Sequence, residues 1–150
     1  MRDCCAFGAR TNQVTSSQNG KTSETGADNL SGLRILVVED SWHAGVALKN
    51  LLRALGAEVL GPVATAADAE RLISGPRPHV GIVDFNLRGG ELAVDLIDKL
   101  NEHGICVIVI SAYASVPLAP GTAMAVLQKP VIESQLLAVL RPLAAQKSVQ

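Results

Sequence analysis

The sequence predicts an α/β fold built on a doubly wound parallel sheet, and three observations support this fold class. Short apolar runs without polar interruption alternate along the chain with segments whose leucines recur at helical spacing. A strand buried on both faces gives such a continuous run, and this burial is typical of parallel sheets covered by helices. A length of 150 residues and an apolar fraction of 48% suit a single folded domain.

The first half of this domain alternates strand and helix. The run from Leu33 to Val38 ends at an acidic pair and predicts a fully buried strand. Apolar residues between Ala44 and Leu55 share one helical face, and Gly56 is placed to end that helix. Residues 58–63 predict a second strand. Thr65, with Asp68 three residues later, predicts the start of a helix that continues to about Ile73.

The second half continues the alternation after a turn rich in proline and glycine at residues 75–78. Three further strands are predicted at residues 80–85, 105–110 and 123–127, with a helix at 91–100 between the first two. A last helix is indicated by Leu136, Leu137, Val139, Leu140 and Leu143, and Pro142 is expected to kink it or to end it early.

The domain boundaries follow from composition. Residues 1–32 are rich in small polar residues without periodicity and predict a disordered N-terminal tail. Residues 33–145 carry the alternating pattern and form the expected domain, and residues 146–150 form a short C-terminal tail.

Charge and cysteine content exclude several classes of partner and location. Thirteen Lys and Arg residues balance fourteen Asp and Glu residues to a net charge of -1, which offers no field for nucleic acid or an anionic membrane. Cys4, Cys5 and Cys106 do not form a disulfide framework, and the N-terminus lacks the apolar stretch of a signal peptide. We therefore expect a cytoplasmic protein that binds neither nucleic acid nor membrane.

Polar residues recur where the predicted strands end. Glu39 and Asp40 follow the first strand, Asp84 ends the third, Ser111 ends the fourth and Lys129 follows the fifth. In doubly wound folds the site lies at the carboxyl ends of the strands. Carboxylates crowded there need a cation, and hard oxygen ligands suit Mg²⁺. A lysine and a hydroxyl opposite them can hold an anion. The pattern is typical of an aspartate that accepts a phosphoryl group.

In this order and at these spacings, the five elements Glu39-Asp40, Asp84, Ser111, Lys129 and Pro130 resemble the receiver domain of two-component response regulators. The resemblance implies a flavodoxin-like fold with five parallel strands in the order 2-1-3-4-5 and five helices. It also implies that Asp84 accepts a phosphoryl group from the phosphohistidine of a sensor histidine kinase or a histidine phosphotransfer protein.

The resemblance further implies a role for each strand-end residue. Asp84 would be the nucleophile. Asp40 and Asp84 would ligate Mg²⁺ directly together with the backbone carbonyl of Asn86, and Glu39 would act through water. Lys129 would contact the phosphoryl oxygens. Two plainer readings remain open: the acidic pair could form a structural ion pair with Lys129, and Ser111 could merely cap a strand end.

The switch residues depart from the usual pattern of the family. After transfer, Ser111 would bind a phosphoryl oxygen, and an aromatic ring three residues before the lysine would normally follow it inward. This chain has Val126 at that place and Tyr113 two residues after Ser111. It is thus partly similar to the stand-alone FATGUY receivers of alphaproteobacteria. We expect Tyr113 to act as the switch residue, and the alternative is a ring that merely packs on the fourth helix.

Only a short segment follows the expected receiver, which implies a single-domain regulator that is not an enzyme beyond autodephosphorylation. Its output would be a downstream protein or onward phosphotransfer, and the face of the fourth helix, fifth strand and fifth helix could also form a homodimer. One alternative is a degenerate receiver that serves as a constitutive interaction module. Another is a haloacid-dehalogenase-like phosphatase, which would need a second acid where this chain has Asn86. A flavodoxin-like cofactor binder is disfavoured by the acidic pair after the first strand.

Overall fold

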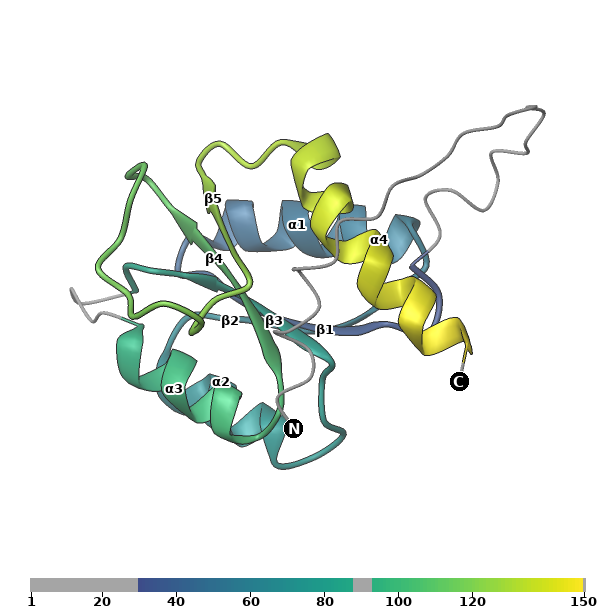
Figure 1. The fold of residues 1–150 in the computed structure, drawn as a ribbon, viewed down its shortest axis with the longest axis horizontal. Coiled ribbons are helices and arrows are strands. Elements are labelled where there is room, and N and C mark those ends of the chain that lie inside the picture. Colours follow the sequence, from purple (N-terminus) through teal and green to yellow (C-terminus); the bar gives the residue numbers. More distant parts are fainter. Residues whose placement is uncertain (1–29, 88–92, 150) are drawn as a thin grey trace.

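The structure is a computed structural model that describes residues 30–87 and 93–149. These residues form a five-stranded sheet in the order β2-β1-β3-β4-β5, and every neighbouring pair is parallel (Figure 1). The strands are β1 (Arg34–Val38), β2 (Glu58–Val63), β3 (Val80–Asp84), β4 (Cys106–Ser111) and β5 (Ala125–Gln128). The helices are α1 (Trp42–Ala54), α2 (Ala66–Ile73), α3 (Val94–Glu102) and α4 (Glu133–Val149). The predicted fold class and strand order are confirmed.

Helices cover both faces of the sheet, as the unbroken apolar strands require. α1 and α4 pack on one face around a cluster that includes Ile35, Val37 and Ile108. α2 and α3 lie on the other face (Figure 1), around a cluster that includes Leu36 and Val107. Alternate residues of each strand therefore enter opposite layers. The sheet is therefore the middle of three layers, and helices on both faces border its carboxyl edge.

The helix starts agree with the sequence signals. The Thr65 side chain accepts a hydrogen bond from the backbone N–H of Asp68 at 3.2 Å, which confirms the predicted N-cap of α2. Ser41 caps α1 in the same way by accepting from the N–H of Ala44 at 3.3 Å. Both caps lie within three residues of a strand end, so each fixes how the chain leaves the carboxyl edge of the sheet.

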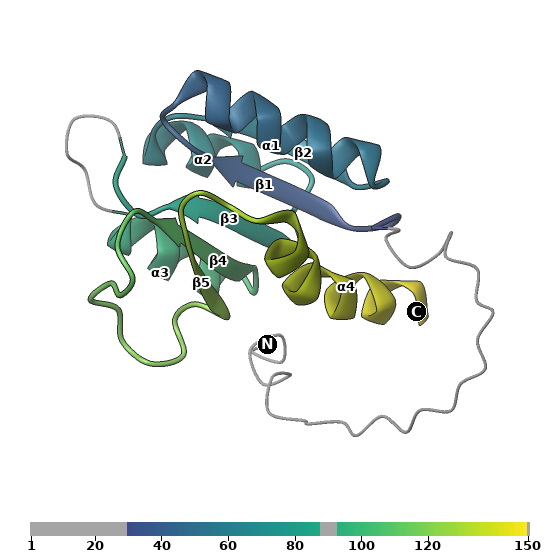
Figure 2. The ribbon, with the colours of Figure 1, turned by 90° about the horizontal axis from the view of Figure 1, so that it is seen from above.

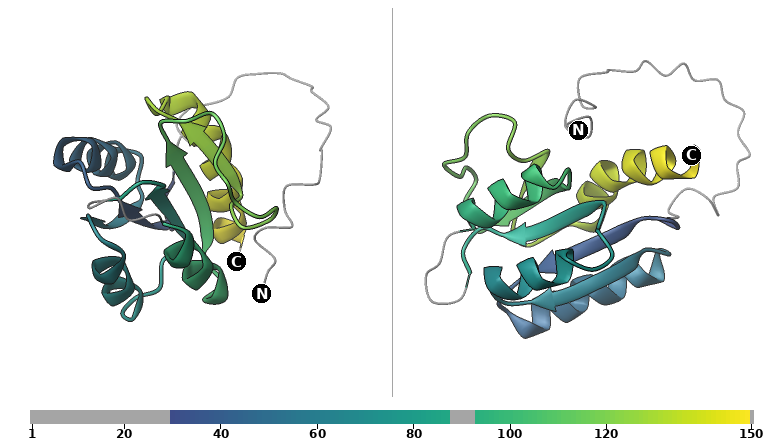
Figure 3. Two further views of the ribbon diagram at one scale, coloured as in Figure 1. Left: turned by 90° about the vertical axis from the view of Figure 1, so that its left-hand side faces the viewer. Right: turned by 90° about the horizontal axis from the view of Figure 1, so that it is seen from below.

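The resemblance implies five helices, whereas the described residues contain four. The helix expected between β4 and β5 is absent, and residues 112–124 form a loop there (Figures 2 and 3). Pro117, Pro120 and Gly121 fall within this segment. A proline lacks the N–H donor and disfavours helical backbone at the residue before it, and glycine weakens a helix further. The expectation of a fourth helix on this side of the sheet was wrong, because three breakers lie within five residues.

Pro142 does not end the last helix. α4 continues past it to Val149, with Pro142 inside the helix. A proline in a helix interior removes one backbone hydrogen bond and costs about 3 kcal/mol. Leu136, Leu140 and Leu143 from the same helix are buried in the core, and their burial offsets that cost.

The expected N-terminal tail falls largely on residues 1–29, which lie outside the described residues, as do residues 91 and 92 of the predicted third helix. Leu30 is fully buried, and its N–H donates to the carbonyl of Leu55 at 2.7 Å. Cys106 is buried. None of the described helices combines the length and the apolar character that a membrane span needs.

Candidate functional site

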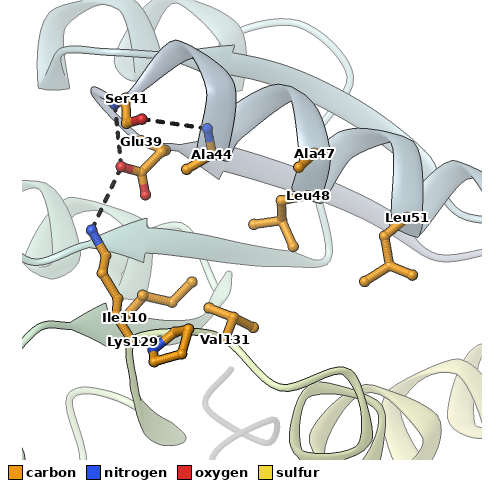
Figure 4. A pocket seen from close by; sticks show the side chains of 10 residues that line it. Glu39, Ser41, Ala44, Ala47, Leu48, Leu51, Ile110, Lys129 and Val131 are labelled. Carbon is orange, nitrogen blue, oxygen red and sulfur yellow. Dashed lines mark hydrogen bonds and ion pairs between the residues drawn. The ribbon is translucent and has the colours of Figure 1, made fainter.

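The parallel sheet brings the polar strand ends to one edge. Glu39 follows β1, Asp84 is the last residue of β3, and Lys129 follows β5. The Lys129 Nζ atom lies 3.1 Å from Oδ2 of Asp84 and 3.7 Å from Oε2 of Glu39. Figure 4 shows the lysine side chain reaching across to Glu39 from the opposite wall. Asp84 and Glu39 precede Lys129 by 45 and 90 residues in the sequence, yet all three side chains lie together at this edge, as the strand-end pattern predicts.

Three carboxylates form a cluster beside this lysine. Glu39, Asp40 and Asp84 each offer an oxygen, and these oxygens lie within 4.8 Å of one another. Glu39 and Asp84 are buried, whereas Asp40 is half-buried. Hard carboxylate oxygens at such spacing are the donor set that Mg²⁺ takes, with water completing its coordination shell. The residues present therefore fit a magnesium ion.

Backbone groups hold the two buried carboxylates in place. The N–H of Ser41 donates to Oε2 of Glu39 at 3.2 Å, and the N–H of Asn86 donates to Oδ1 of Asp84 at 3.2 Å. Asn86 itself is exposed at the start of the loop whose residues 88–92 lie outside the described residues. Each carboxylate is aimed by the residue two positions after it, so the local turn sets the orientation of the side chain.

The end of β2 supports Glu39 in a way that the sequence analysis missed. The N–H of Glu39 donates to the carbonyl of Val63 at 2.8 Å, just after a break in the β1–β2 register. Gly61 there has a φ of 99°, and a Cβ atom on it would lie 2.6 Å from the carbonyl oxygen of Val37. Only glycine fits this close approach. A Gly-Pro pair inside a predicted strand is the signal that marks such a bulge.

Ser111 is fully buried at the end of β4 and pairs across the sheet with Gln128, the residue before Lys129. Its Oγ atom accepts a hydrogen bond from the N–H of Tyr113 at 2.9 Å, and its carbonyl accepts from the N–H of Lys129 at 2.8 Å. The hydroxyl keeps its own proton available as a donor. Ser111 therefore connects the lysine backbone on one side with the start of the 112–124 loop on the other.

Tyr113 is 63% exposed, and Val126 is also exposed. The alternative in which the ring packs on a fourth helix was wrong, because residues 112–124 contain no helix. Trp42, at the start of α1, is exposed as well.

The electrostatics of the cluster favour a bound cation. Burial raises the pKa of Glu39, and the neighbouring charge of Asp84 raises it further. Burial alone would lower the pKa of Lys129, but its hydrogen bond to Asp84 and the charge of Glu39 outweigh burial and raise it. Lys129 is therefore a cation at neutral pH. One ammonium does not balance three carboxylates, so the edge carries an excess of negative charge.

This arrangement can support transfer of an anionic group to Asp84. A magnesium ion would neutralise the carboxylates and polarise the incoming oxygens. The Lys129 ammonium and the Ser111 hydroxyl would then lie on the same edge as donors to the incoming anion.

The comparisons with known proteins find similarity in structure. No protein-family model matches the chain, and no curated protein matches it. A receiver domain protein (CheY-like) from Methanospirillum hungatei JF-1 is 25% identical, with a TM-score of 0.69 over 79% of this chain and 98% of the other. The signal receiver domain of a modulated diguanylate cyclase from Desulfovibrio desulfuricans G20 is 26% identical, with a TM-score of 0.66 over 77% of this chain and 96% of the other.

A third similar structure is longer than this chain. The response regulator PhyR from Brucella abortus is 20% identical, with a TM-score of 0.67 over 83% of this chain. The match spans 55% of the PhyR chain, so this similarity concerns the fold of one part of that protein. These matches agree with the strand order of the sheet and with the placement of the acidic cluster and the lysine at its carboxyl edge. The described part of this chain therefore has the fold of the CheY-like receiver domains of response regulators and is similar to them in structure.

Proposed function

We propose that this protein is a response regulator whose receiver domain accepts a phosphoryl group on Asp84. The observation that carries the proposal is the 3.1 Å contact between Lys129 Nζ and Asp84 Oδ2 beside three clustered carboxylates. The donor is the phosphohistidine of a sensor histidine kinase or a histidine phosphotransfer protein. Such a partnership places the protein in the cytoplasm.

In the proposed reaction an Asp84 carboxylate oxygen attacks the phosphorus of the phosphohistidine. The P–O bond forms as the P–N bond breaks, and the imidazole leaves with the bonding pair and takes up a proton. Asp40, Asp84 and the Asn86 carbonyl would hold Mg²⁺ directly, with Glu39 acting through water. Lys129 would neutralise the phosphoryl oxygens, and Ser111 would donate a hydrogen bond to one of them after transfer.

The output is a protein–protein contact that depends on phosphorylation, or onward transfer of the phosphoryl group. The exposed Tyr113 ring supports a role for this residue as the switch, since its N–H already holds the Ser111 hydroxyl. This would match the FATGUY-type receivers. A homodimer through β5, α4 and the 112–124 loop is a further form that the output could take. We propose no enzymatic activity beyond autodephosphorylation.

Acetyl phosphate with Mg²⁺ tests the proposal. We expect one acid-stable, base-labile phosphoryl group per chain in intact-mass spectrometry, lost in Asp84→Asn. No modification of the wild type under these conditions would favour the degenerate interaction module. Continuous turnover of unrelated phosphoesters would instead favour a haloacid-dehalogenase-like phosphatase. Asp98→Asn, an exposed aspartate on α3, is the matched control.

A further inference from the structure

An open cavity of about 410 Å³ lies beside the acidic edge, between α1 and the connection from β5 to α4. One wall is the α1 face of Ala44, Ala47, Leu48 and Leu51, and the opposite wall comprises Ile110, Pro130 and Val131. Figure 4 shows these side chains facing each other across the space, with Glu39 and Lys129 at one end. The cavity is therefore apolar along its length and charged at that end.

The cavity has the dimensions of a small-molecule site. Pockets for small molecules commonly measure about 300–1,000 Å³ and combine apolar walls with a few polar groups. The lining residues of α1 run from Ala44 to Leu51, which corresponds to about 10 Å at 1.5 Å per residue. Ala44 and Ala47 remain exposed because the space beside them is open. A slender apolar body fits this space better than a bulky one.

The charged end specifies the head group of a ligand. Glu39 lines the cavity and belongs to the cluster of three carboxylates, which only Lys129 among the lining residues balances in part. An anionic head would meet two buried carboxylates, Glu39 and Asp84, and would compete for a lysine already bonded to Asp84 at 3.1 Å. A cationic head beside Glu39 instead reduces the excess negative charge. Charge complementarity therefore favours an amine.

We propose that this cavity binds a small amphiphilic amine, with its apolar body between α1 and Val131 and its ammonium group beside Glu39. Binding requires no phosphorylation of Asp84, so the proposal stands or fails separately from the proposed function. Because the ammonium and Mg²⁺ would neutralise the same carboxylates, the two bind in competition. The cavity would thus connect the concentration of such an amine with metal occupancy at the acidic edge.

Octylamine is the probe, below its aggregation concentration, and amide chemical shifts in ¹H–¹⁵N NMR spectra are the measurement. We expect shifts at Ala44, Ala47, Leu48, Leu51 and Val131 that saturate. The apparent Kd should be about tenfold lower than for octanol or octanoate because of the charged end. Butylamine should bind about a hundredfold more weakly, because it buries four fewer methylene groups. Added Mg²⁺ should raise the octylamine Kd.

Two matched variants locate the site. Ala47→Trp fills the cavity and should abolish the saturable shifts, whereas Asn50→Trp places the same side chain on an exposed position of α1 outside the lining and should leave them unchanged. Glu39→Gln should remove the preference for octylamine over octanol. If Ala47→Trp fails to fold by circular dichroism, Ala44→Leu takes its place. Equal affinity for all three eight-carbon probes, shifts mapping elsewhere, or equal loss in Asn50→Trp would overturn the proposal.

Discussion

Lys129 Nζ lies 3.1 Å from Asp84 Oδ2, although β4 separates the strands from which the two residues come. The contact is possible because Asp84 ends β3, while Lys129 follows the end of β5, where its backbone N–H is held by the carbonyl of Ser111 at 2.8 Å. The register between β4 and β5 therefore sets where the ammonium group lies.

Removing the ammonium should slow phosphorylation without removing the acceptor. In Lys129→Gln the phosphoryl oxygens lose a charged donor, and loss of one such group typically costs about a hundredfold in rate. The rate of Asp84 modification by acetyl phosphate, followed by intact-mass spectrometry, measures this effect. Lys99→Gln removes an exposed lysine paired with Glu70 and should leave the rate unchanged. Equal rates in Lys129→Gln and wild type would contradict a role for this ammonium in transfer.

Magnesium should stabilise the folded protein through the carboxylate cluster. A ligand present at a hundredfold excess over its Kd adds about 2.7 kcal/mol to the free energy of unfolding. Urea denaturation with and without EDTA should therefore show a magnesium-dependent gain that disappears in Asp40→Asn. The fluorescence of Trp42, which is the chain's single tryptophan, reports the same titration. An identical gain in Asp40→Asn would place the metal elsewhere.

Without magnesium, stability should fall as the pH rises from about the ordinary pKa of a glutamate. The pKa of Glu39 is raised above its ordinary value of 4.5 by burial and then by the charge of Asp84. The folded state therefore retains a proton that the unfolded state has lost, and this contribution to stability disappears as the pH passes through the raised pKa. Thermal unfolding in EDTA between pH 4.5 and 7 measures the slope.

Glu39→Gln is the control for this pH dependence, since it removes the titrating group while it preserves the size of the side chain. Its melting temperature should vary less with pH over the same range. A slope that is unchanged in Glu39→Gln would show that other groups produce it.

Gly61→Ala should destabilise the fold and disturb Glu39. The new Cβ would lie 2.6 Å from the Val37 carbonyl oxygen, and the φ of 99° adds a strain of about 1–2 kcal/mol for an L side chain. Gly104→Ala is the matched control, because its φ is 75° but no atom lies within 4 Å of the new Cβ. The free energy of unfolding should therefore fall more in Gly61→Ala, and equal losses would leave backbone strain as the whole effect.

Tyr113→Ala should separate phosphorylation from output. The N–H that holds Ser111 belongs to the backbone and survives the substitution, so the rate of Asp84 modification should stay within about twofold of wild type. Binding of the downstream protein to the phosphorylated form should weaken, since the exposed ring is lost. Tyr113→Phe keeps the ring and separates its contribution from that of the hydroxyl. Unchanged partner binding in Tyr113→Ala would remove Tyr113 from the switch.

Most of the sheet can be predicted from the sequence, because a strand buried on both faces requires a continuous apolar run. Each such run ends at a polar residue, which marks the end of the strand. β2 matches its predicted bounds of 58–63, and the polar residues after β1 and β5 meet because parallel strands share a carboxyl edge. The helix that the family resemblance implies between β4 and β5 is a wrong prediction. Pro117 and Pro120 lie in this segment of the sequence and disfavour helical backbone there. The helix α4 is predicted, but its expected early end at Pro142 is wrong, since tertiary burial of Leu140 and Leu143 overrides the local cost of Pro142. The cavity beside α1 depends on the spacing of side chains from three elements, which no linear pattern encodes.

The loop between β4 and β5 has a consequence for how a signal would spread from the buried serine. A helix moves as a rigid rod because its backbone bonds tie each turn to the next. The loop is attached at separate points instead: the Asn101 side chain donates to the carbonyl of Thr122 at 2.8 Å, and the N–H of Met124 donates to Val107 at 2.8 Å. Both attachments lie near its second end, while the Ser111–Tyr113 bond lies at its first. At that first end the Gln128 side chain of β5 also donates to the carbonyl of Ala112 at 3.3 Å. A change there would therefore bend a short stretch of backbone and reach β5 through Gln128, so the signal would be carried by local shape between Tyr113 and β5 and not by displacement of a whole helix.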